Sequence, residues 1–250
     1  MGSLHEGHLS LIEKAYSEND EIIVSIYVNP TQFNDKEDLK KYPRNIKEDL
    51  KKLNRFENII VYAPDNNDLY EKNESSKQYD FGSFTSLMEG KHRPGHFDGV
   101  MRVVKLLFDI VQPDKAFFGL KDFQQFLVIQ KMAKVLNMEI EVLGCDIVRE
   151  ENGLAMSSRN KRLSNTELKN ALVLQKALNH CKNNFGKMGL QALQAECFGI
   201  LQKESEPEYF EICDAESLSP ITEVSEPQKI RAFTATSIGE IRLIDNMEIV

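Results

Sequence analysis

Short apolar segments rich in β-branched residues alternate with amphipathic segments through the first 145 residues of this chain. The predicted strands are residues 22–28, 59–63, 115–118 and 139–144. The predicted helices, whose apolar residues recur at helical spacing, are residues 8–18, 45–54, 98–111 and 122–136. Because helices and strands alternate in short units, we expect parallel strands joined by crossover helices in a layered α/β fold.

The pattern changes near residue 148. Ser164 and Glu167 have the spacing of a capping box, which predicts a long helix to about residue 184. A second helix and three short strands are predicted at residues 190–203, 208–214, 230–236 and 240–244. We therefore expect a catalytic domain over residues 1–147, with a Rossmann-like parallel sheet, and a small α+β lid domain over residues 148–250.

Composition narrows the classes of function. The formal net charge of −8 argues against a dedicated nucleic-acid binder, which presents a basic face. No apolar run approaches the about 20 residues of a transmembrane helix, and the N-terminus lacks the pattern of a secretory signal. The four cysteines are scattered, which favours reduced buried thiols in a cytoplasmic protein over a disulfide or zinc framework.

The first chemical motif is a pair of histidines at the start of the first predicted helix. His5 and His8 are three residues apart and so share one face of a helical turn. A helix N-terminus attracts phosphate, and Gly2 and Gly7 leave room for a nucleotide near the backbone. Two imidazoles there could stabilise charge in nucleotidyl transfer. A surface pair without function is the alternative, and the three-residue spacing does not match a zinc protease helix.

Two further segments combine hydroxyl or carboxylate groups with a cation. Ser157, Ser158 and Arg159 follow an Asn-Gly turn and could clamp a phosphate, although such a loop can also be only a loop. Lys121 and Asp122 follow the strand at residues 115–118, where parallel α/β sheets bind ligands. A plain turn between strand and helix is the alternative for this second segment.

Polar amides and a basic loop complete the set of candidate residues. Gln32 lies at the end of a predicted strand, in VNPTQF, and Gln125 lies in the first turn of a predicted helix. Such amides can bind a substrate hydroxyl or carboxylate. Residues 89–97, EGKHRPGHF, predict either a mobile lid over an anionic substrate or an ordinary loop.

The order of these motifs resembles that of the pantothenate synthetase (pantoate–β-alanine ligase) family. The resemblance is carried by MGSLHEGH, VNPTQF, YPR, EGKHRPGHFDGV, FGLKDFQQ and VREENGLAMSSRN, and it covers residues 1 to about 163. The C-terminal part matches mainly in length and in IRLIDN. The resemblance implies a His-x-Gly-His nucleotidyltransferase that joins pantoate to β-alanine through pantoyl adenylate, with release of AMP and pyrophosphate.

The resemblance also implies roles for individual residues. The implied catalytic residues are His8, His5, Lys121, Ser157, Ser158 and Arg159. The implied ATP-binding residues are Met1, Gly2, Ser3, Leu4, His5, Glu6, Gly7, His8, Gly119, Leu120, Lys121, Asp122, Val148, Met156, Ser157, Ser158 and Arg159. The implied substrate-binding residues are Gln32, Gln125 and Asn29, with Gln32 also near β-alanine. His8 matches the position usually called the proton donor, and we expect it mainly to stabilise phosphate charge.

The implied cofactors are ATP and Mg²⁺, and the implied assembly is a homodimer formed through the first domain, with no membrane or nucleic-acid partner. Glu48 and Asp49 are a candidate Mg²⁺ pair, and a solvated helix face is the alternative. Family members normally have a leading central strand that runs into Pro-Thr-Met-Gly, whereas this sequence begins at that Met. We therefore expect a sheet without its middle strand and with two free strand edges.

Two alternative functions remain open at this point. One is another enzyme of the same superfamily, such as a cytidylyltransferase or an aminoacyl-tRNA synthetase fragment. The acidic charge balance and the features at Gln32 and Gln125 argue against it. The other is a nucleotide-binding protein without catalytic activity.

Overall fold

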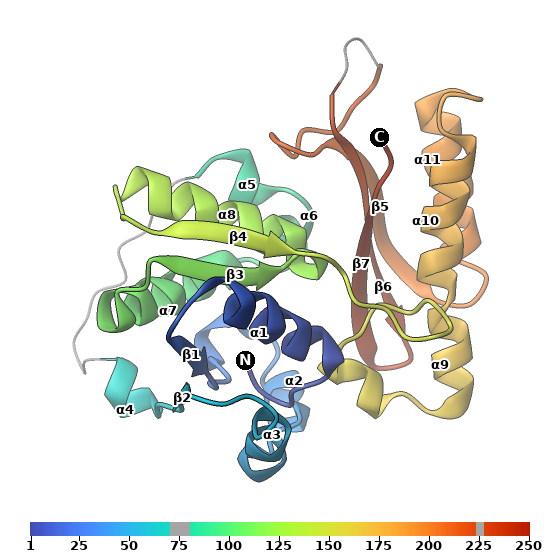
Figure 1. Ribbon diagram of the computed structural model, residues 1–250. Coiled ribbons are helices and arrows are strands. Elements are labelled where there is room, and N and C mark those ends of the chain that lie inside the picture. Colours follow the sequence, from blue (N-terminus) through green and yellow to red (C-terminus); the bar gives the residue numbers. More distant parts are fainter. Residues whose placement is uncertain (71–80, 224–227) are drawn as a thin grey trace.

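The computed structural model describes residues 1–70, 81–223 and 228–250 (Figure 1). In the part of the chain up to residue 145, the longer elements are α1 (Glu6–Glu18), β1 (Ile22–Ser25), α3 (Ile46–Leu53), β2 (Ile59–Tyr62), α7 (His96–Val111), β3 (Lys115–Gly119), α8 (Phe123–Val135) and β4 (Glu141–Cys145). The shorter helices are α2 (Lys36–Lys41), α4 (Asn66–Leu69), α5 (Ser83–Ser86) and α6 (Met88–His92). Every strand and helix predicted for this part of the chain is present, to within a few residues. The four shorter helices were not predicted.

The strands of this part form two separate parallel pairs. β1 pairs with β2, and β3 pairs with β4, each in parallel register. Within the described residues no ladder joins β1 to β3, so the predicted parallel strands form two two-stranded sheets. Next to β1, the Met1 amino group donates to the Ser25 carbonyl, and the Tyr27 N–H donates to the Met1 carbonyl.

Helix α1 connects the two strand pairs. It contacts β1, β3 and β4, and its buried face consists of Leu9, Leu11, Ile12 and Ala15, the apolar stripe predicted from the sequence. Leu9, Ile12 and Ala15 of this stripe pack with Leu4 and Phe117 in one hydrophobic cluster. The start of α1, which carries the histidine motif, is therefore held at fixed positions relative to both pairs.

The rest of the chain folds around one antiparallel sheet with strand order β5-β6-β7. Its elements are α9 (Asn165–Ala171), α10 (Val173–Asn184), α11 (Leu190–Leu201), β5 (Glu206–Asp214), β6 (Ile230–Ile238) and β7 (Ile241–Glu248). The capping box at Ser164 is confirmed, but the single long helix predicted there divides at Leu172 into α9 and α10. Helices α10 and α11 cover the face of the sheet that lies away from the parallel strands (Figure 1).

A fourth hydrophobic cluster joins the two parts of the molecule. It contains Phe123 at the start of α8, together with Tyr209 on β5 and Phe233 on β6. The rings of Phe123 and Phe233 lie 5.9 Å apart. The first turn of α8, where Lys121 and Asp122 precede the helix, is therefore packed directly against the antiparallel sheet.

Cys145, Cys181, Cys197 and Cys213 are all free and buried, as predicted. In the described residues no helix combines the length and apolar character needed to cross a membrane.

Candidate active site

His5 and His8 face each other where α1 begins. His5 is the N-cap residue, its N–H donates to Nδ1 of His8 at 3.3 Å, and the two ring centroids lie 3.9 Å apart. Because Nδ1 of His8 accepts a hydrogen bond, the proton of the neutral ring lies on Nε2. The His5 side chain faces the backbone N–H of His8 in a capping box, but no regular hydrogen bond reaches its buried Nδ1 atom within the described residues. An unpaired buried polar atom of this kind calls for a functional explanation.

The charges around these rings are predominantly positive. Burial lowers the pKa of His5 to about 4, and the positive charges of Lys121, Lys161 and Lys52 contribute to the lowering. The pKa of His8 is also lowered, first by burial and then by His5, the terminal amino group and Lys121. Both rings are therefore neutral at pH 7 and lie in the field of several cations. Such a field attracts an anion and can stabilise charge that develops on it.

The Ser-Ser-Arg segment packs directly against the N-terminal motif. Ser158 Oγ donates to the Ser3 carbonyl at 3.0 Å, and Lys161 Nζ donates to Ser3 Oγ at 3.0 Å. A Cβ on Gly7 would lie 3.6 Å from the Cβ of Met156. The tighter contact of such a Cβ would be with the His5 ring at 3.1 Å, so Gly7 leaves room for that ring, and a Cβ on Gly2 would similarly lie 3.1 Å from Val28. The lack of side chains at these glycines makes room for protein neighbours.

Lys121 and Asp122 lie in a short 3₁₀ turn, Leu120–Asp122, between β3 and α8. Lys121 Nζ lies 3.7 Å from an Asp122 carboxylate oxygen, and the Lys121 charge acts on both histidines. A Cβ on Gly119 would meet no atom within 4 Å, so the backbone beside this turn borders open space. The predicted convergence of Lys121 with the histidine motif is therefore present.

A cleft of about 530 Å³ lies between the two parts of the molecule. Lys121, Asp122, Ser157 and Arg159 line it from the segments named above, and Arg242 lines it from β7. The volume is within the range of small-molecule sites in proteins. The predicted phosphate-binding cations therefore border one cavity of a suitable size.

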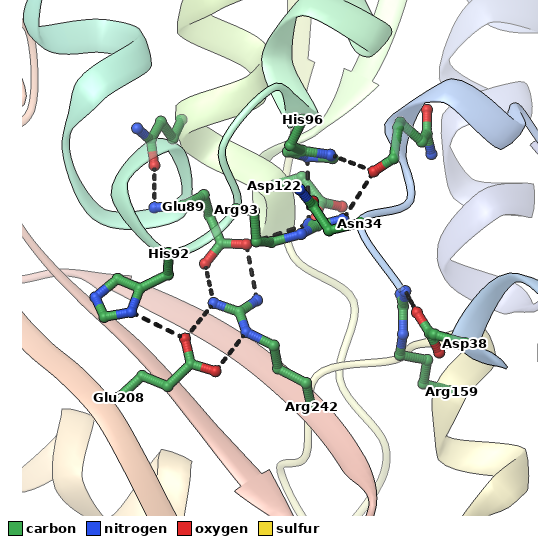
Figure 2. Close-up of polar contacts among 12 residues, drawn as sticks. Asn34, Asp38, Glu89, His92, Arg93, His96, Asp122, Arg159, Glu208 and Arg242 are labelled. Carbon is green, nitrogen blue, oxygen red and sulfur yellow. Dashed lines mark hydrogen bonds and ion pairs between the residues drawn. The ribbon is translucent and has the colours of Figure 1, made fainter. Parts of the chain in front are cut away.

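Helix α2 lines one side of the cleft, and its residue Asp38 forms ion pairs with two arginines of the lining. Asp38 accepts from Arg159 at 2.7 Å (Figure 2). It also accepts from Arg162 at 2.6 Å. Burial alone raises the pKa of Asp38, but the two guanidinium groups outweigh it and hold the pKa below its usual value. No local sequence pattern points to Asp38, since its partners lie more than 120 residues along the chain.

Gln32 and Asn29 are held next to each other at the end of β1. The Gln32 carbonyl accepts from His96 Nδ1 at 2.8 Å and from Arg93 at 3.2 Å (Figure 2). Asn29 is buried, and its side-chain oxygen accepts from Thr31 and Tyr70. Its amide group donates to Gly99 and, at 3.4 Å, to the side chain of Gln32. Asn29 thus orients the Gln32 side chain and has its own polar groups occupied.

Gln125 is half-buried in the first turn of α8, whereas its neighbour Gln124 is buried. The amide of Gln124 donates to the carbonyls of Phe84 and Leu87, so this glutamine has a structural role. Val148 is half-buried, and its carbonyl accepts from the Met156 N–H at 3.0 Å. Val148 is thereby connected to the Ser-Ser-Arg segment.

Residues 89–97, which form most of α6 and the start of α7, contribute to a buried ion cluster that was not predicted. Glu89 accepts from Arg242 at 2.7 and 2.8 Å (Figure 2). It also accepts from Tyr209 at 2.8 Å. Arg242 also binds Glu208, which lies 3.4 Å from His92. Burial alone raises the pKa of Glu89, but Arg242, Arg93 and Tyr209 lower it to about 2. The loop is therefore anchored between the two parts of the molecule, which does not favour the mobile lid.

Glu48 and Asp49 do not fit the proposed magnesium site. The two carboxylate oxygens of Asp49 accept from the N–H groups of Ser3, at 2.9 Å, and Leu4, at 2.6 Å. Glu48 is exposed on α3. Among the described residues no three histidine, cysteine or acidic side chains gather as a metal site. Asp49 instead holds the N-terminal segment in place, including Ser3, whose φ of +50° is unusual for a residue with a side chain.

Comparison with known families identifies the chain's relatives. Residues 1–248 match the pantoate-β-alanine ligase family. The chain belongs to the pantoate-β-alanine ligase family. The pantothenate synthetase of Flavobacterium psychrophilum is 44% identical over all of this chain and 89% of the relative. That of Bacteroides thetaiotaomicron is 41% identical over 99% of this chain and 88% of the relative.

Solved structures of the family have the same fold. The pantothenate synthetase of Thermus thermophilus is 39% identical and superposes with a TM-score of 0.94, over all of this chain and 91% of that one. The pantoate-β-alanine ligase of Francisella tularensis, solved with a β,γ-ATP compound and β-alanine, is 33% identical with a TM-score of 0.82. It is matched over all of this chain and 87% of its own. These matches confirm the predicted family and favour a ligase over a cytidylyltransferase or an aminoacyl-tRNA synthetase fragment.

Proposed function

We propose that this chain condenses pantoate with β-alanine in an ATP-dependent reaction that forms pantothenate, AMP and pyrophosphate. The family match supports the reaction class. The observation that carries the assignment of the site is the convergence of His5, His8 and Lys121 on one place, with a buried ring nitrogen left unpaired. Excess positive charge and an unpaired polar atom fit the phosphates of ATP.

In the first step, a pantoate carboxylate oxygen attacks the α-phosphorus of ATP. The bond from the α-phosphorus to the bridging oxygen breaks, and pyrophosphate leaves with the electron pair. We assign His8 Nε2–H, His5 and Lys121 to the phosphate oxygens on which charge develops, and Ser157, Ser158 and Arg159 to the same phosphates from the opposite segment. Because phosphoryl chemistry depends on positioning and charge stabilisation, no covalent bond to the enzyme is needed.

In the second step, the neutral amine of β-alanine attacks the acyl carbon of pantoyl adenylate. The bond between the acyl carbon and the phosphate oxygen breaks, AMP leaves, and the amine loses its extra proton. We assign Gln32 and Gln125 to pantoate, with Gln32 also near β-alanine. Asn29 contributes by orienting Gln32, to which its amide donates.

We assign the remaining nucleotide contacts to the N-terminal segment, the turn after β3 and the segment that ends at Arg159. The N-terminal contacts are Met1, Gly2, Ser3, Leu4, Glu6 and Gly7. Those after β3 are Gly119, Leu120 and Asp122, and those near Arg159 are Val148 and Met156. Magnesium enters the proposal only as a counter-ion carried by the ATP phosphates, in the way Mg²⁺ is commonly bound beside substrate phosphates.

We further propose a catalytic domain at residues 1–147, a lid domain at residues 148–250, and a cytoplasmic homodimer. Ile23 and Ile60 support the dimer, because they are register partners on β1 and β2 and are 41% and 54% exposed. Paired exposed isoleucines are a candidate contact surface between copies. Free buried cysteines support a reducing compartment.

The experiment that tests the reaction is the release of AMP from ATP, with pantoate and β-alanine each omitted in turn. The proposal predicts release that requires both substrates. Binding of ATP without turnover, in a protein that circular dichroism shows to be folded, would leave the alternative of a nucleotide-binding protein without activity. Turnover with tRNA or CTP in place of these substrates would contradict the proposal.

A further inference from the structure

Two neighbouring residues of β7, Asp245 and Asn246, each attach to a different ATP-facing segment. We propose that these two residues are positioning residues, which fix the distance between the Lys121 turn and the Ser-Ser-Arg segment. The inference rests on the proposed function, because it assumes that both segments face one nucleotide. Neither residue was selected from the sequence, where they form part of the closing IRLIDN.

Asn246 holds the backbone of the Lys121 turn. Its side-chain Nδ2 donates to the Lys121 carbonyl at 2.8 Å and to the Leu120 carbonyl at 3.0 Å. Its side-chain oxygen accepts from Arg231 at 2.7 Å. Because carbonyls lie on one side and a guanidinium on the other, only this orientation of the amide satisfies its partners. Asn246 is 2% exposed, so no water competes for these bonds.

Asp245 holds the other segment through Arg149. Its two carboxylate oxygens accept from the Arg149 guanidinium at 2.7 and 3.0 Å, an arrangement that restricts orientation as well as distance. Arg149 also donates to the Gly153 carbonyl at 3.1 Å. An isolated β-bridge pairs Arg149 with Ala155, which directly precedes Met156 and the two serines in the chain. Asp245 therefore fixes the base of the segment that carries Ser157 and Arg159.

The two residues are also joined to each other and to α8. One oxygen of Asp245 accepts from the Asn246 backbone N–H at 2.8 Å. Arg231, the partner of Asn246, lies with its guanidinium 4.2 Å from the centre of the Phe123 ring, in the first turn of α8. The dipeptide thus forms one rigid connection from the antiparallel sheet to both segments. A shift of about 1 Å in such a support can lower a rate about 100-fold without removing any reacting group.

The test compares Asn246→Asp and Asn246→Ala with Thr236→Ala. Asn246→Asp keeps the shape of the side chain but places an acceptor against two carbonyls. Thr236 is a fully buried residue of the same sheet whose hydroxyl has no partner among the described residues, so Thr236→Ala measures the effect of lost packing alone. For each variant we would measure the melting temperature, the Kd for ATP by calorimetry, kcat, and KM for β-alanine.

We expect both Asn246 variants to weaken ATP binding at least about 10-fold and to lower kcat about 10- to 100-fold. KM for β-alanine should stay within about 2-fold, because Gln32 is held by α7 and not by β7. Thr236→Ala should match the wild type in Kd and kcat. A similar loss in Thr236→Ala, or wild-type Kd and kcat in both Asn246 variants, would overturn the inference.

The outcomes also separate this inference from the proposed function. A wild-type protein that binds ATP but makes no AMP contradicts the proposed function, and a weaker Kd in the Asn246 variants would then still support the positioning role. If the wild-type protein turns over normally and the Asn246 variants have the same Kd and kcat, only the positioning role is overturned. A wild-type protein that does not bind ATP overturns both.

Discussion

Two polar regions adjoin the cleft, one through Lys121 and the other through Arg242, and they differ in how their charges are balanced. Around His5, the nearby charges are mainly those of lysines, and the Nδ1 atom has no partner among the described residues. Around Glu89, the carboxylate binds Arg242, Arg93 and Tyr209. The first region has more positive than negative charge, since Asp122 lies beside Lys121 but Lys161 and Lys52 add to it, whereas the second has its charges paired.

This difference indicates that the region around His5 binds a ligand, whereas the region around Glu89 stabilises the fold. A buried ion pair that is complete has little capacity for a ligand, and removing one partner is costly because the other charge stays buried. A buried region with excess charge is destabilising in the absence of ligand and gains most when an anion binds. Substitutions at Glu89 should therefore affect mainly folding, and those at Lys121 mainly catalysis.

The largest effect on stability is expected for Glu89→Ala. This variant leaves Arg242 without its carboxylate partner in a buried place, and the free energy of unfolding should fall by about 3 kcal/mol or more. Urea denaturation would measure it. The control is Glu240→Gln, which breaks the exposed pair with Lys41 and should leave the free energy of unfolding close to that of the wild type. Equal effects of the two substitutions would contradict the account of the paired cluster.

For the first region, Lys121→Ala and His8→Ala should each slow adenylation about 100-fold or more, as the loss of a transition-state donor does. Lys121→Ala should change the free energy of unfolding only slightly, because its ion pair with Asp122 is partly exposed. His8→Ala should lower it modestly, because the His5 N–H loses its acceptor. Single-turnover formation of pyrophosphate, with urea denaturation beside it, checks both parts. Unchanged rates would refute the assigned roles.

The buried histidines and Glu89 should respond to pH in different windows. Burial lowers the pKa of His5 and of His96 to about 4, below the 6.5 of the unfolded chain. The unfolded state therefore binds more protons, and stability should fall as pH drops from about 6.5 to about 4. Glu89, with a pKa of about 2 against 4.5, should contribute a further loss between about pH 4.5 and 2.

Denaturation at a series of pH values measures this profile. His96→Gln should reduce the loss of stability between about pH 6.5 and 4, and Glu89→Gln should reduce the loss between about pH 4.5 and 2. If either variant instead reduced the loss of stability in the other pH range, the charge states would be assigned incorrectly.

The smallest effect is expected for Asp38→Asn. This substitution releases Arg159 from a competing carboxylate, so ATP should bind about 3-fold more tightly, in line with the modest energy of a partly exposed ion pair. Asp35→Asn removes the same charge from the cleft lining without touching Arg159, because Asp35 caps α2 through the Glu37 N–H. Equal gains in the two variants would indicate a general charge effect instead.

The sequence predicted the regular elements because they depend on local patterns. The stripe of Leu9, Ile12 and Ala15 gave α1, and the capping box gave the start of α9. It did not predict the break at Leu172, where contacts with the antiparallel sheet decide between one helix and two. Nor did it predict α2, whose residues 36–41 are nearly all charged and lack an apolar stripe.

The site was predictable where its chemistry lies within one short segment. His5 and His8, or Ser157 and Arg159, can be recognised from neighbours in the chain. Asp38, Glu89 and Asn246 could not be, because each acts through a partner 120 or more residues away, and only folding brings the two together. The Asp49 carboxylate was misleading for the same reason, since its partners are backbone groups 45 and 46 residues away.

The most direct test of the central claim, that the cation-rich region binds ATP for adenylation of a carboxylate, is isotope exchange between pyrophosphate and ATP. The account predicts exchange that requires pantoate, proceeds without β-alanine, and is lost in Lys121→Ala while that variant stays folded. Exchange that needs β-alanine, or equal exchange in Lys121→Ala, would contradict it.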